Sequence, residues 1–230
     1  MKQRILGMML LGILMIGHPA EAAFGGFRIG GIFGVQYLKG RHWYTGGTFS
    51  PNNDTVARLG AISSLYGVTA GYLVELGASK IVLGGEVYAF MPQANPTLNL
   101  SLYLGKKEGT VAIQHTRSIG YVVTAGMMFN PKVMAYLNAG LEMARYEFKY
   151  NFLPAAGISP PLPSQQILRH IFKAIMVGAG ATYKIAPHLL IGLEASAPFF
   201  KRFKARTEAP RAFSYKPVEW RVAFKLSYLF

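Results

Sequence analysis

The chain has no cysteine, few acidic residues and little charge altogether. Without cysteine it can form neither a disulfide scaffold nor a cysteine-based metal site or nucleophile. Charged residues make up 15% of its 230 positions, against roughly 25% in ordinary soluble domains. Beyond the N-terminus, no apolar run reaches the ~20 residues of a membrane-spanning helix. A chain that is 51% hydrophobic must therefore place its apolar surface in a large core or on the lipid-facing outside of a β-barrel.

The N-terminus has the pattern of a secretory signal peptide. Lys2 and Arg4 give a positive start, a short apolar run follows, and Ala20-Glu21-Ala22 forms a small-x-small cleavage site. We expect cleavage after Ala22, which divides the chain into a signal peptide, residues 1–22, and one mature domain, residues 23–230. An uncleaved anchor helix is the alternative.

Apolar residues recur at every second position in eight stretches, which is typical of β-strands with one apolar face. The stretches are residues 27–37, 66–76, 81–90, 119–129, 133–143, 175–183, 189–197 and 221–230. Strands of about 9–11 residues suffice to cross a membrane when tilted. We therefore expect eight crossings.

The connections between these stretches alternate between short and long. Residues 77–80, 130–132 and 184–188 form tight turns, and the other four connections are long and polar or rich in proline. Short turns at one end and long loops at the other indicate an all-β, eight-stranded antiparallel up-and-down transmembrane β-barrel. Residues 98–115 suggest a further hairpin, which we interpret as the third and fourth strands continuing beyond the membrane after a break at 92–96.

A repeated Gly-apolar-Glu pattern identifies the inward face of the barrel. It places Glu86, Glu142 and Glu194 at equivalent positions in alternate strands. These side chains must point inward, because a charge facing lipid at the bilayer midplane costs roughly 2–4 kcal/mol. The predicted ionic residues of the lumen are Arg28, Glu75, Glu86, Glu142, Glu194 and Lys225. Among them we predict two ion pairs, Glu194 with Lys225 and Arg28 with Glu75, which either only fill the barrel or gate ion leak.

Aromatic residues gather near the strand ends, where amphipathic rings favour the membrane interface. The predicted belts are Tyr72, Phe129, Tyr183, Tyr228 and Phe230 at the short-turn end, and Tyr37, Phe90, Phe148, Phe199 and Phe200 at the other. Ordinary β-propensity is the alternative explanation.

The long connections are basic, within a chain of formal net charge +14. Lys and Arg pair with phosphate groups, so we predict contact with lipopolysaccharide. The predicted contact residues are Arg145, Lys173, Lys201, Arg202, Lys204 and Arg206. A solvated basic loop is the alternative, and nucleic acid is not expected as a partner of an exported membrane protein.

Catalysis is not expected, and neither is a cofactor or a metal. The best candidate pair is His115 with Ser118, but simple strand alternation places the two side chains on opposite faces. A nucleophile needs its base within hydrogen-bond reach. We therefore predict that the protein is not an enzyme.

The whole pattern resembles the small outer-membrane barrels of Gram-negative bacteria, such as the OmpA transmembrane domain, OmpX and the opacity proteins. It resembles them in the signal, the eight strands, the Gly-apolar-Glu repeats and the ending. That family carries a terminal assembly signal, which Phe224, Leu226, Tyr228 and Phe230 match here. The resemblance implies insertion by the outer-membrane assembly machinery and a barrel with both termini in the periplasm.

Two roles remain open at this point. The first is a structural barrel or a small or closed pore, embedded in outer-membrane lipid. The second is a surface adhesin that binds a host or glycan ligand through its long loops. A soluble lipocalin-like barrel is a third option, but it needs a polar exterior that these strands lack.

We expect removal of Phe230 to impair assembly, because the closing strand would lose the terminal aromatic residue of the assembly signal. The measurement is the yield of folded barrel in the outer-membrane fraction. A normal yield of the truncated protein would contradict this expectation.

Overall fold

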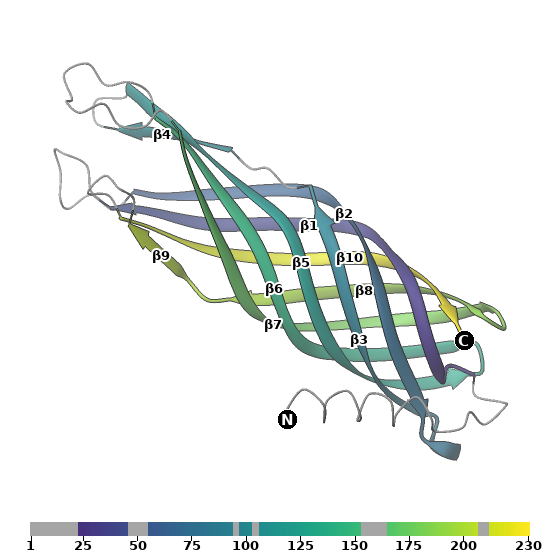
Figure 1. Ribbon diagram of the computed structural model, residues 1–230. Helices are drawn as coiled ribbons and strands as arrows, with labels where there is room; N and C mark the ends of the chain where they lie inside the picture. Colours follow the sequence, from purple (N-terminus) through teal and green to yellow (C-terminus); the bar gives the residue numbers. More distant parts are fainter. Residues whose placement is uncertain (1–22, 46–54, 94–96, 103–105, 153–164, 207–211) are drawn as a thin grey trace, which may run out of the picture.

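A computed structural model of the chain describes residues 23–45, 55–93, 97–102, 106–152, 165–206 and 212–230. Nearly all of them lie in antiparallel strands that wrap around one barrel (Figure 1). The strands are β1 (Gly26–Thr45), β2 (Thr55–Glu75), β3 (Ile81–Pro92), β4 (Thr97–Leu102), β5 (Lys106–Asn130), β6 (Val133–Phe152), β7 (Gln165–Ala186), β8 (Leu189–Phe200), β9 (Phe203–Arg206) and β10 (Ala212–Leu229). In this part of the chain, no helix has the length and apolarity required to traverse a membrane. The signal peptide lies outside the described residues and stays a prediction.

The barrel closes through its first and last strands. The order around the ring is β1-β2-β3-β5-β6-β7-β8-β10, and β10 pairs back with β1 from Arg28 opposite Leu229 to Thr45 opposite Ala212. The backbone N–H of Phe230 also donates to the carbonyl of Phe27 at 2.8 Å. The predicted eight-stranded up-and-down ring, with the last stretch paired to the first, is confirmed.

Short turns join the strands at the end of the barrel that holds the described termini, here called the turn end. The short 3-10 helix η1 (Gly77–Ser79) and turns at residues 131–132 and 187–188 make these connections. Lys80, after η1, has a left-handed backbone with φ of 59°. These positions agree with the three predicted tight turns.

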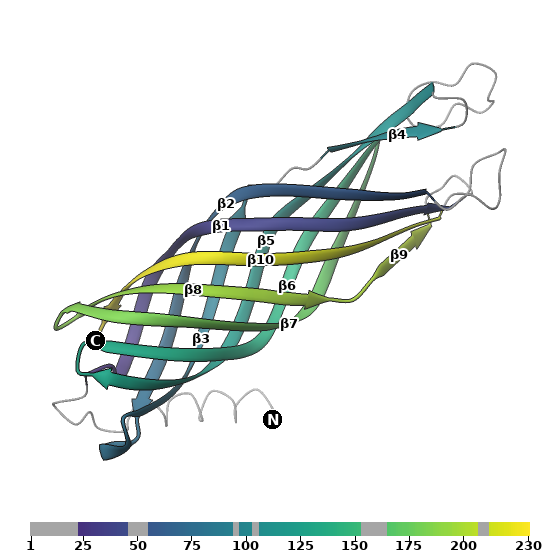
Figure 2. The same ribbon diagram turned by 180° about the vertical axis from the view of Figure 1, so that it is seen from behind.

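At the opposite, loop end the strands run further than predicted. β4 and β9 extend the barrel there, pairing with β5 and β10 (Figure 2). The continuation of the third and fourth strands is confirmed. Strand lengths of 9–11 residues are wrong, and the last long connection, between residues 197 and 221, was expected to be a loop but is largely strand in its described part. Antiparallel neighbours can go on satisfying each other's backbone groups in water beyond the membrane.

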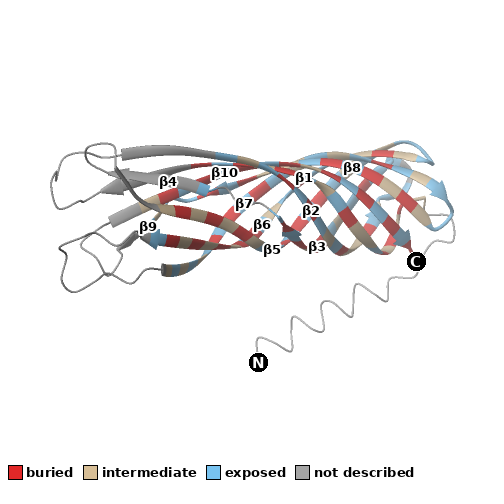
Figure 3. Cartoon of the chain, turned by 90° about the horizontal axis from the view of Figure 1, so that it is seen from above, coloured by how far each residue is buried: buried red, intermediate tan, exposed pale blue. Residues whose placement is uncertain are grey.

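Side chains alternate between interior and exterior along every strand, which gives the striped pattern of Figure 3. The outward positions of one continuous zone are apolar or glycine, and we call this zone the apolar band. It covers residues 27–37 on β1, 66–76 on β2, 81–91 on β3, 119–129 on β5, 133–143 on β6, 175–185 on β7, 189–199 on β8 and 218–230 on β10. Leu137 and Val123 in the band are 66% and 62% exposed, so the barrel presents hydrocarbon to its surroundings. The length of the band matches a tilted strand crossing a bilayer.

Among the described residues, packed side chains occupy the interior at both ends and in the middle. At the turn end an apolar cluster that includes Phe24, Leu73 and Met134 forms a floor. At the loop end an aromatic cluster includes Tyr146, Phe172 and Tyr215. Eight strands leave only enough interior for side chains, so ionic residues must share the middle layer with apolar ones.

The predicted aromatic belts are only partly present. At the turn end Phe129, Tyr183 and Phe230 are exposed, as expected of an interfacial belt. At the loop end Phe199 is 62% exposed, but the rings of Phe90, Phe148 and Phe200 are buried in the barrel, so assigning these three to a belt is wrong. They have the inward parity of their strands, and the alternation decides which side of the wall a ring occupies.

We expect Leu137→Arg to lower the free energy of unfolding from lipid vesicles by about 2–4 kcal/mol, because it places a charge in the apolar band. Ile167→Arg is the matched control, since Ile167 is also exposed but lies on β7 beyond the apolar band. The control should cost about 1 kcal/mol or less. Equal costs, measured by urea unfolding, would show that the band does not face hydrocarbon.

Candidate functional site

Two groups of charged side chains occupy the middle of the barrel, and the group nearer the turn end is balanced. Glu86 contacts Arg28 Nη2 and Lys225 Nζ, each at 2.6 Å, and Lys225 Nζ also lies 2.7 Å from Glu194. The Tyr136 hydroxyl donates to Glu194 at 3.0 Å. Two cations therefore meet two carboxylates, and every charged group in this lower cluster has a partner.

Tyr136 reaches Glu194 across a glycine. A side-chain carbon at Gly180 would lie 2.6 Å from the ring and hydroxyl of Tyr136. The glycine on β7 therefore makes room for the aromatic ring from β6. Close approach to a neighbouring ring is a common reason for glycine within a strand.

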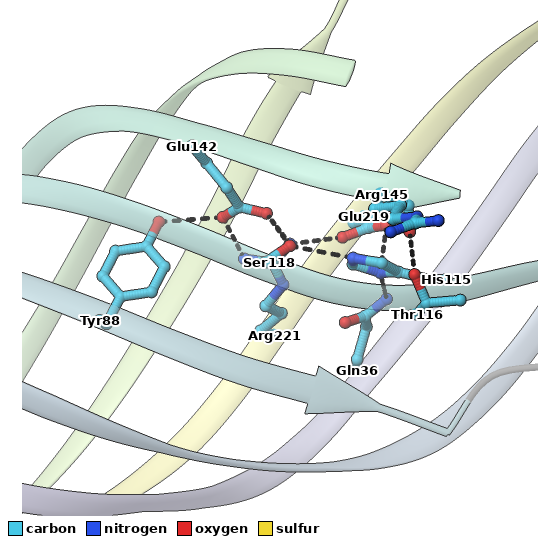
Figure 4. Close-up of polar contacts among 9 residues, drawn as sticks. All are labelled: Gln36, Tyr88, His115, Thr116, Ser118, Glu142, Arg145, Glu219 and Arg221. Carbon is cyan, nitrogen blue, oxygen red and sulfur yellow. Dashed lines mark hydrogen bonds and ion pairs between the residues drawn. The ribbon is translucent and has the colours of Figure 1, made fainter. Parts of the chain in front are cut away.

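The second group, the upper cluster, is organised by Arg221 (Figure 4). The guanidinium contacts Glu142 through both terminal nitrogens, at 2.6 and 2.7 Å, and Glu219 at 2.6 Å. It also lies 4.5 Å from the centre of the Phe90 ring. Tyr88 donates to Glu142 at 3.0 Å. Paired charges and bidentate geometry offset the cost of taking these ions out of water.

His115 and Ser118 complete the upper cluster. The Ser118 hydroxyl donates to Glu142 at 2.7 Å, and His115 Nε2 lies 2.9 Å from the same hydroxyl. His115 Nδ1 lies 3.0 Å from Gln36 Nε2 and 3.2 Å from Glu219 Oε1. Both His115 and Ser118 are 0% exposed.

The prediction that His115 and Ser118 face opposite sides of the wall is wrong. The pairing of β5 with β6 shifts register between His115 and Arg117, so Thr116 is an extra residue in β5. A bulge of this kind reverses the alternation, and both side chains therefore point inward. The sequence carried a signal for it, because the inward positions are odd-numbered up to His115 and even-numbered from Ser118.

The two predicted ion pairs have different outcomes. The structure brings Glu194 and Lys225 together, as described above. The Arg28–Glu75 pair is wrong, because Arg28 contacts Glu86 and Glu75 instead accepts the backbone N–H groups of Phe24 and Gly25. Arg28 is opposite Gly71 in the register with β2, so Glu75 lies further toward the turn end.

Glu219 is a member of the upper cluster that sequence reasoning missed. It is 2% exposed and lies on β10, in a stretch assigned to a loop by the sequence. Glu219 and Arg221 are two residues apart and therefore face the same side of a strand. This spacing is informative only if β10 is known to extend as far as Glu219.

The order Ser118–His115–Glu219 is that of a nucleophile, a base and an acid, yet its protons point the wrong way. The Ser118 proton is committed to Glu142, so His115 Nε2 must donate to Ser118 rather than accept from it. A nucleophilic serine needs the reverse arrangement. Within the described residues, no group of three His, Asp or Glu side chains is placed to hold a metal ion.

A small cavity of about 30 Å³ separates the two clusters. Glu194, Arg221 and Lys225 are among its lining residues. This volume suits one or two water molecules rather than a permeating solute. The interior is therefore a packed polar plug.

On the outside, a row of basic residues borders the apolar band on its loop side. On six of the eight strands the next outward residue after the band is Lys or Arg, and we call this set the basic collar. It consists of Lys39, Arg117, Arg145, Lys173, Lys201 and Lys216. The other two strands carry Ser64 and Gln93 at this position, so the collar contains no acidic residue.

The residues predicted to contact lipopolysaccharide divide between the collar and the strands beyond it. Arg145, Lys173 and Lys201 belong to the collar, whereas Arg202 and Lys204 are exposed at the loop end. Arg206 lies in β9, and its side chain is outside the described part of the chain. Sequence reasoning did not assign Lys39, Arg117 and Lys216 to this contact. Lys39 and Arg117 have a simple signal, because each is the charge that ends an alternating apolar stretch.

The assembly-signal residues Phe224, Leu226, Tyr228 and Phe230 all lie on the exterior of β10 or directly after it, between 42% and 58% exposed. Their role in assembly stays a prediction.

A closed ring of antiparallel strands with an apolar exterior and a polar plug defines a β-barrel of the transmembrane class. No protein-family model matches the chain, and no curated protein matches its sequence. Solved structures do match in fold. The chain is similar to the outer-membrane protein OprG of Pseudomonas aeruginosa, with 12% identity, a TM-score of 0.55, and coverage of 90% of this chain and 97% of that one.

A second similar structure is the outer-membrane protease OmpT of Escherichia coli. It has 9% identity, a TM-score of 0.51, and coverage of 89% of this chain and 97% of that one. At such identities the likeness concerns the fold alone. The fold is that of outer-membrane β-barrels, a class that includes a protease, so the comparisons leave the non-enzymatic prediction untested.

We expect Arg221→Met to lower the free energy of unfolding by about 3–5 kcal/mol, because it leaves two buried carboxylates without their cation. The control is Arg169→Met, which breaks the exposed ion pair of Arg169 with Glu147 at 2.9 Å. An exposed pair contributes about 1 kcal/mol or less. Urea unfolding in vesicles measures both, and a small effect of Arg221→Met would refute the central role of this guanidinium.

Proposed function

We propose that the protein is an integral outer-membrane β-barrel with a closed interior, held in the outer leaflet by contact between its basic collar and the phosphates of lipopolysaccharide. The collar is the observation that carries this proposal. Six cations without an acidic neighbour in the row border the apolar band on its loop side. Phosphate groups at the surface of a leaflet are the natural counter-ions for such a row.

The orientation of the barrel follows from the ends of its strands. Short turns in barrels of this class face the periplasm, and longer connections face outward. Ala23 accepts a hydrogen bond from Lys184 beside a short turn, and Phe230 lies at the same end, so we place the termini in the periplasm. The collar then lies at the outer surface, and Phe230 is available to the assembly machinery.

A structural role fits the interior better than transport or catalysis. The ion pairs fill the barrel and leave a cavity for about one or two waters. Ser118 donates its proton to Glu142 and has no exposed surface for a substrate. We therefore propose a non-enzymatic barrel with very low conductance in planar bilayers.

One observation favours a recognition role as the second candidate. β4 and β9 carry the sheet beyond the collar, so a rigid scaffold presents the loop end. Replacing residues 203–213 by a short turn should then abolish adhesion to host cells or glycans. Unaltered adhesion would count against this candidate.

We expect lipopolysaccharide to raise the thermal unfolding temperature of the barrel in vesicles, because a ligand that binds only the folded state stabilises it. Changing all six collar residues to Gln should remove most of this rise. The control changes Lys80 and Lys132, which are exposed at the turn end. An unchanged rise in the collar variant would overturn the proposal.

The cellular location of the protein can be tested separately by fractionation. Recovery of the protein in the soluble periplasmic or secreted fraction, without heat-modifiable gel mobility, would overturn the outer-membrane assignment.

A further inference from the structure

Two arginines of the collar face each other directly across a strand pair. Arg117 on β5 is the register partner of Arg145 on β6. Like charges directly opposite each other destabilise a strand pair. The bulge at Thr116 creates this arrangement, and the Thr116 hydroxyl donates to the Arg145 carbonyl at 3.0 Å. An anion bridging the two guanidinium groups would relieve the repulsion.

A third cation lies beside this pair, and the nearest carboxylate is engaged elsewhere. Lys173 on β7 is paired with Met143, two residues from Arg145 on the same face. Glu147 lies on the loop side, 2.9 Å from Arg169 but 3.8 Å from Arg145. Within the described residues, no ion pair involves Arg117 or Lys173.

Below these cations the exterior is hollowed. A shallow depression of about 790 Å³ runs across β5, β6, β7, β8 and β10, lined largely by the small side chains of Ala125, Ala139, Ala179, Ala195 and Ala197. Each of these alanines lies next to a residue of a neighbouring strand. Ala179 is opposite another alanine, Ala195, whereas Ala125 is opposite the larger Leu137. Larger exposed side chains, Leu137 and Trp220, stand among them.

The spacing between the cations and the depression suits one lipid. Arg145 lies six residues beyond Ala139 on the loop side of the depression, which is about 20 Å along β6. With a strand tilt near 45°, this is roughly 14 Å in depth, about half of a hydrocarbon core of ~30 Å. A chain attached to a phosphate at the collar would therefore reach the depression within the outer leaflet.

We propose that Arg117, Arg145 and Lys173 form a clamp for a phosphate group carried by an acyl lipid, and that an acyl chain of the same lipid occupies the alanine-lined depression. This inference rests on the proposed function and narrows a diffuse collar to one site. The planar guanidinium groups bind phosphate oxygens with two parallel donors each, which an ammonium cannot do. The ligand class is a phosphorylated acyl lipid of the outer leaflet.

A second copy of the chain fits this face less well. A twofold axis along the membrane normal would bring the two clamps together at the same height, with six cations facing one another and no acidic residue of the collar row between them. A phosphorylated acyl lipid would instead provide a negative charge for the clamp and an apolar chain for the depression.

The test compares two matched double variants in detergent, with binding of purified lipopolysaccharide followed by native mass spectrometry. We expect R117Q/R145Q to weaken binding about tenfold, because charge-assisted hydrogen bonds are lost. K39Q/K216Q removes the same charge from the opposite part of the collar and should weaken binding much less. Dephosphorylated lipopolysaccharide should bind the unaltered protein and R117Q/R145Q equally weakly.

A separate double variant tests whether an acyl chain occupies the depression. A139F/A179F fills the depression with exposed rings and should weaken binding of lipopolysaccharide without changing folding. The control is Leu141→Phe, on the same exterior but absent from the lining of the depression. Unchanged lipid binding by A139F/A179F would overturn the acyl-chain part.

The remaining outcomes separate this inference from the proposed function. Equal weakening by both charge pairs would overturn the clamp and leave the collar proposal intact. No weakening even in the variant with all six collar residues changed would remove the proposed function as well. Retention of inorganic phosphate by the clamp as strongly as of the lipid would assign it to free phosphate, and a change in oligomeric mass in A139F/A179F would assign the depression to a second copy.

Discussion

The rest of this structure depends on the closure of the backbone hydrogen-bond ladder between β1 and β10. Hydrocarbon offers no partner to an unpaired N–H or C=O group, so a sheet crossing it must have no edge. The pairing from Arg28 with Leu229 to Thr45 with Ala212 removes the last edge. In the closed ring, successive side chains point to opposite sides of the wall. Each one therefore faces either the lipid or the narrow interior.

The narrow interior forces charges into contact. Arg28, Glu86, Glu194 and Lys225 form one connected group, and Arg221 joins Glu142 and Glu219 in another. Apart from the Arg221–Glu219 contact within β10, these ion pairs join different strands, and the contacts of Glu86 and Glu142 link strands that do not pair directly. The exterior follows the opposite rule, with apolar side chains through the band and cations only beyond its edges.

Most of the fold was predictable from the sequence because the period of two is strict where one face meets lipid. The inward glutamates, the Glu194–Lys225 contact and the tight turns follow from counting along strands. The wrong predictions occur where counting residues along a strand does not give the face or the height of a side chain. The bulge at Thr116 reverses the alternation and brings His115 to Ser118, and the Arg28–Glu75 pair fails because register, not strand order, sets height.

The sequence by itself determined the eight membrane crossings, the face that most residues of the apolar band occupy and the width of that band, because these depend on a local period. Only the tertiary structure decided which inward charges meet, that Arg117 lies opposite Arg145, and that five alanines from four strands line one depression. Those facts depend on the stagger between strands far apart in the chain. Stagger is fixed by closure of the whole ring, which no single stretch of sequence encodes.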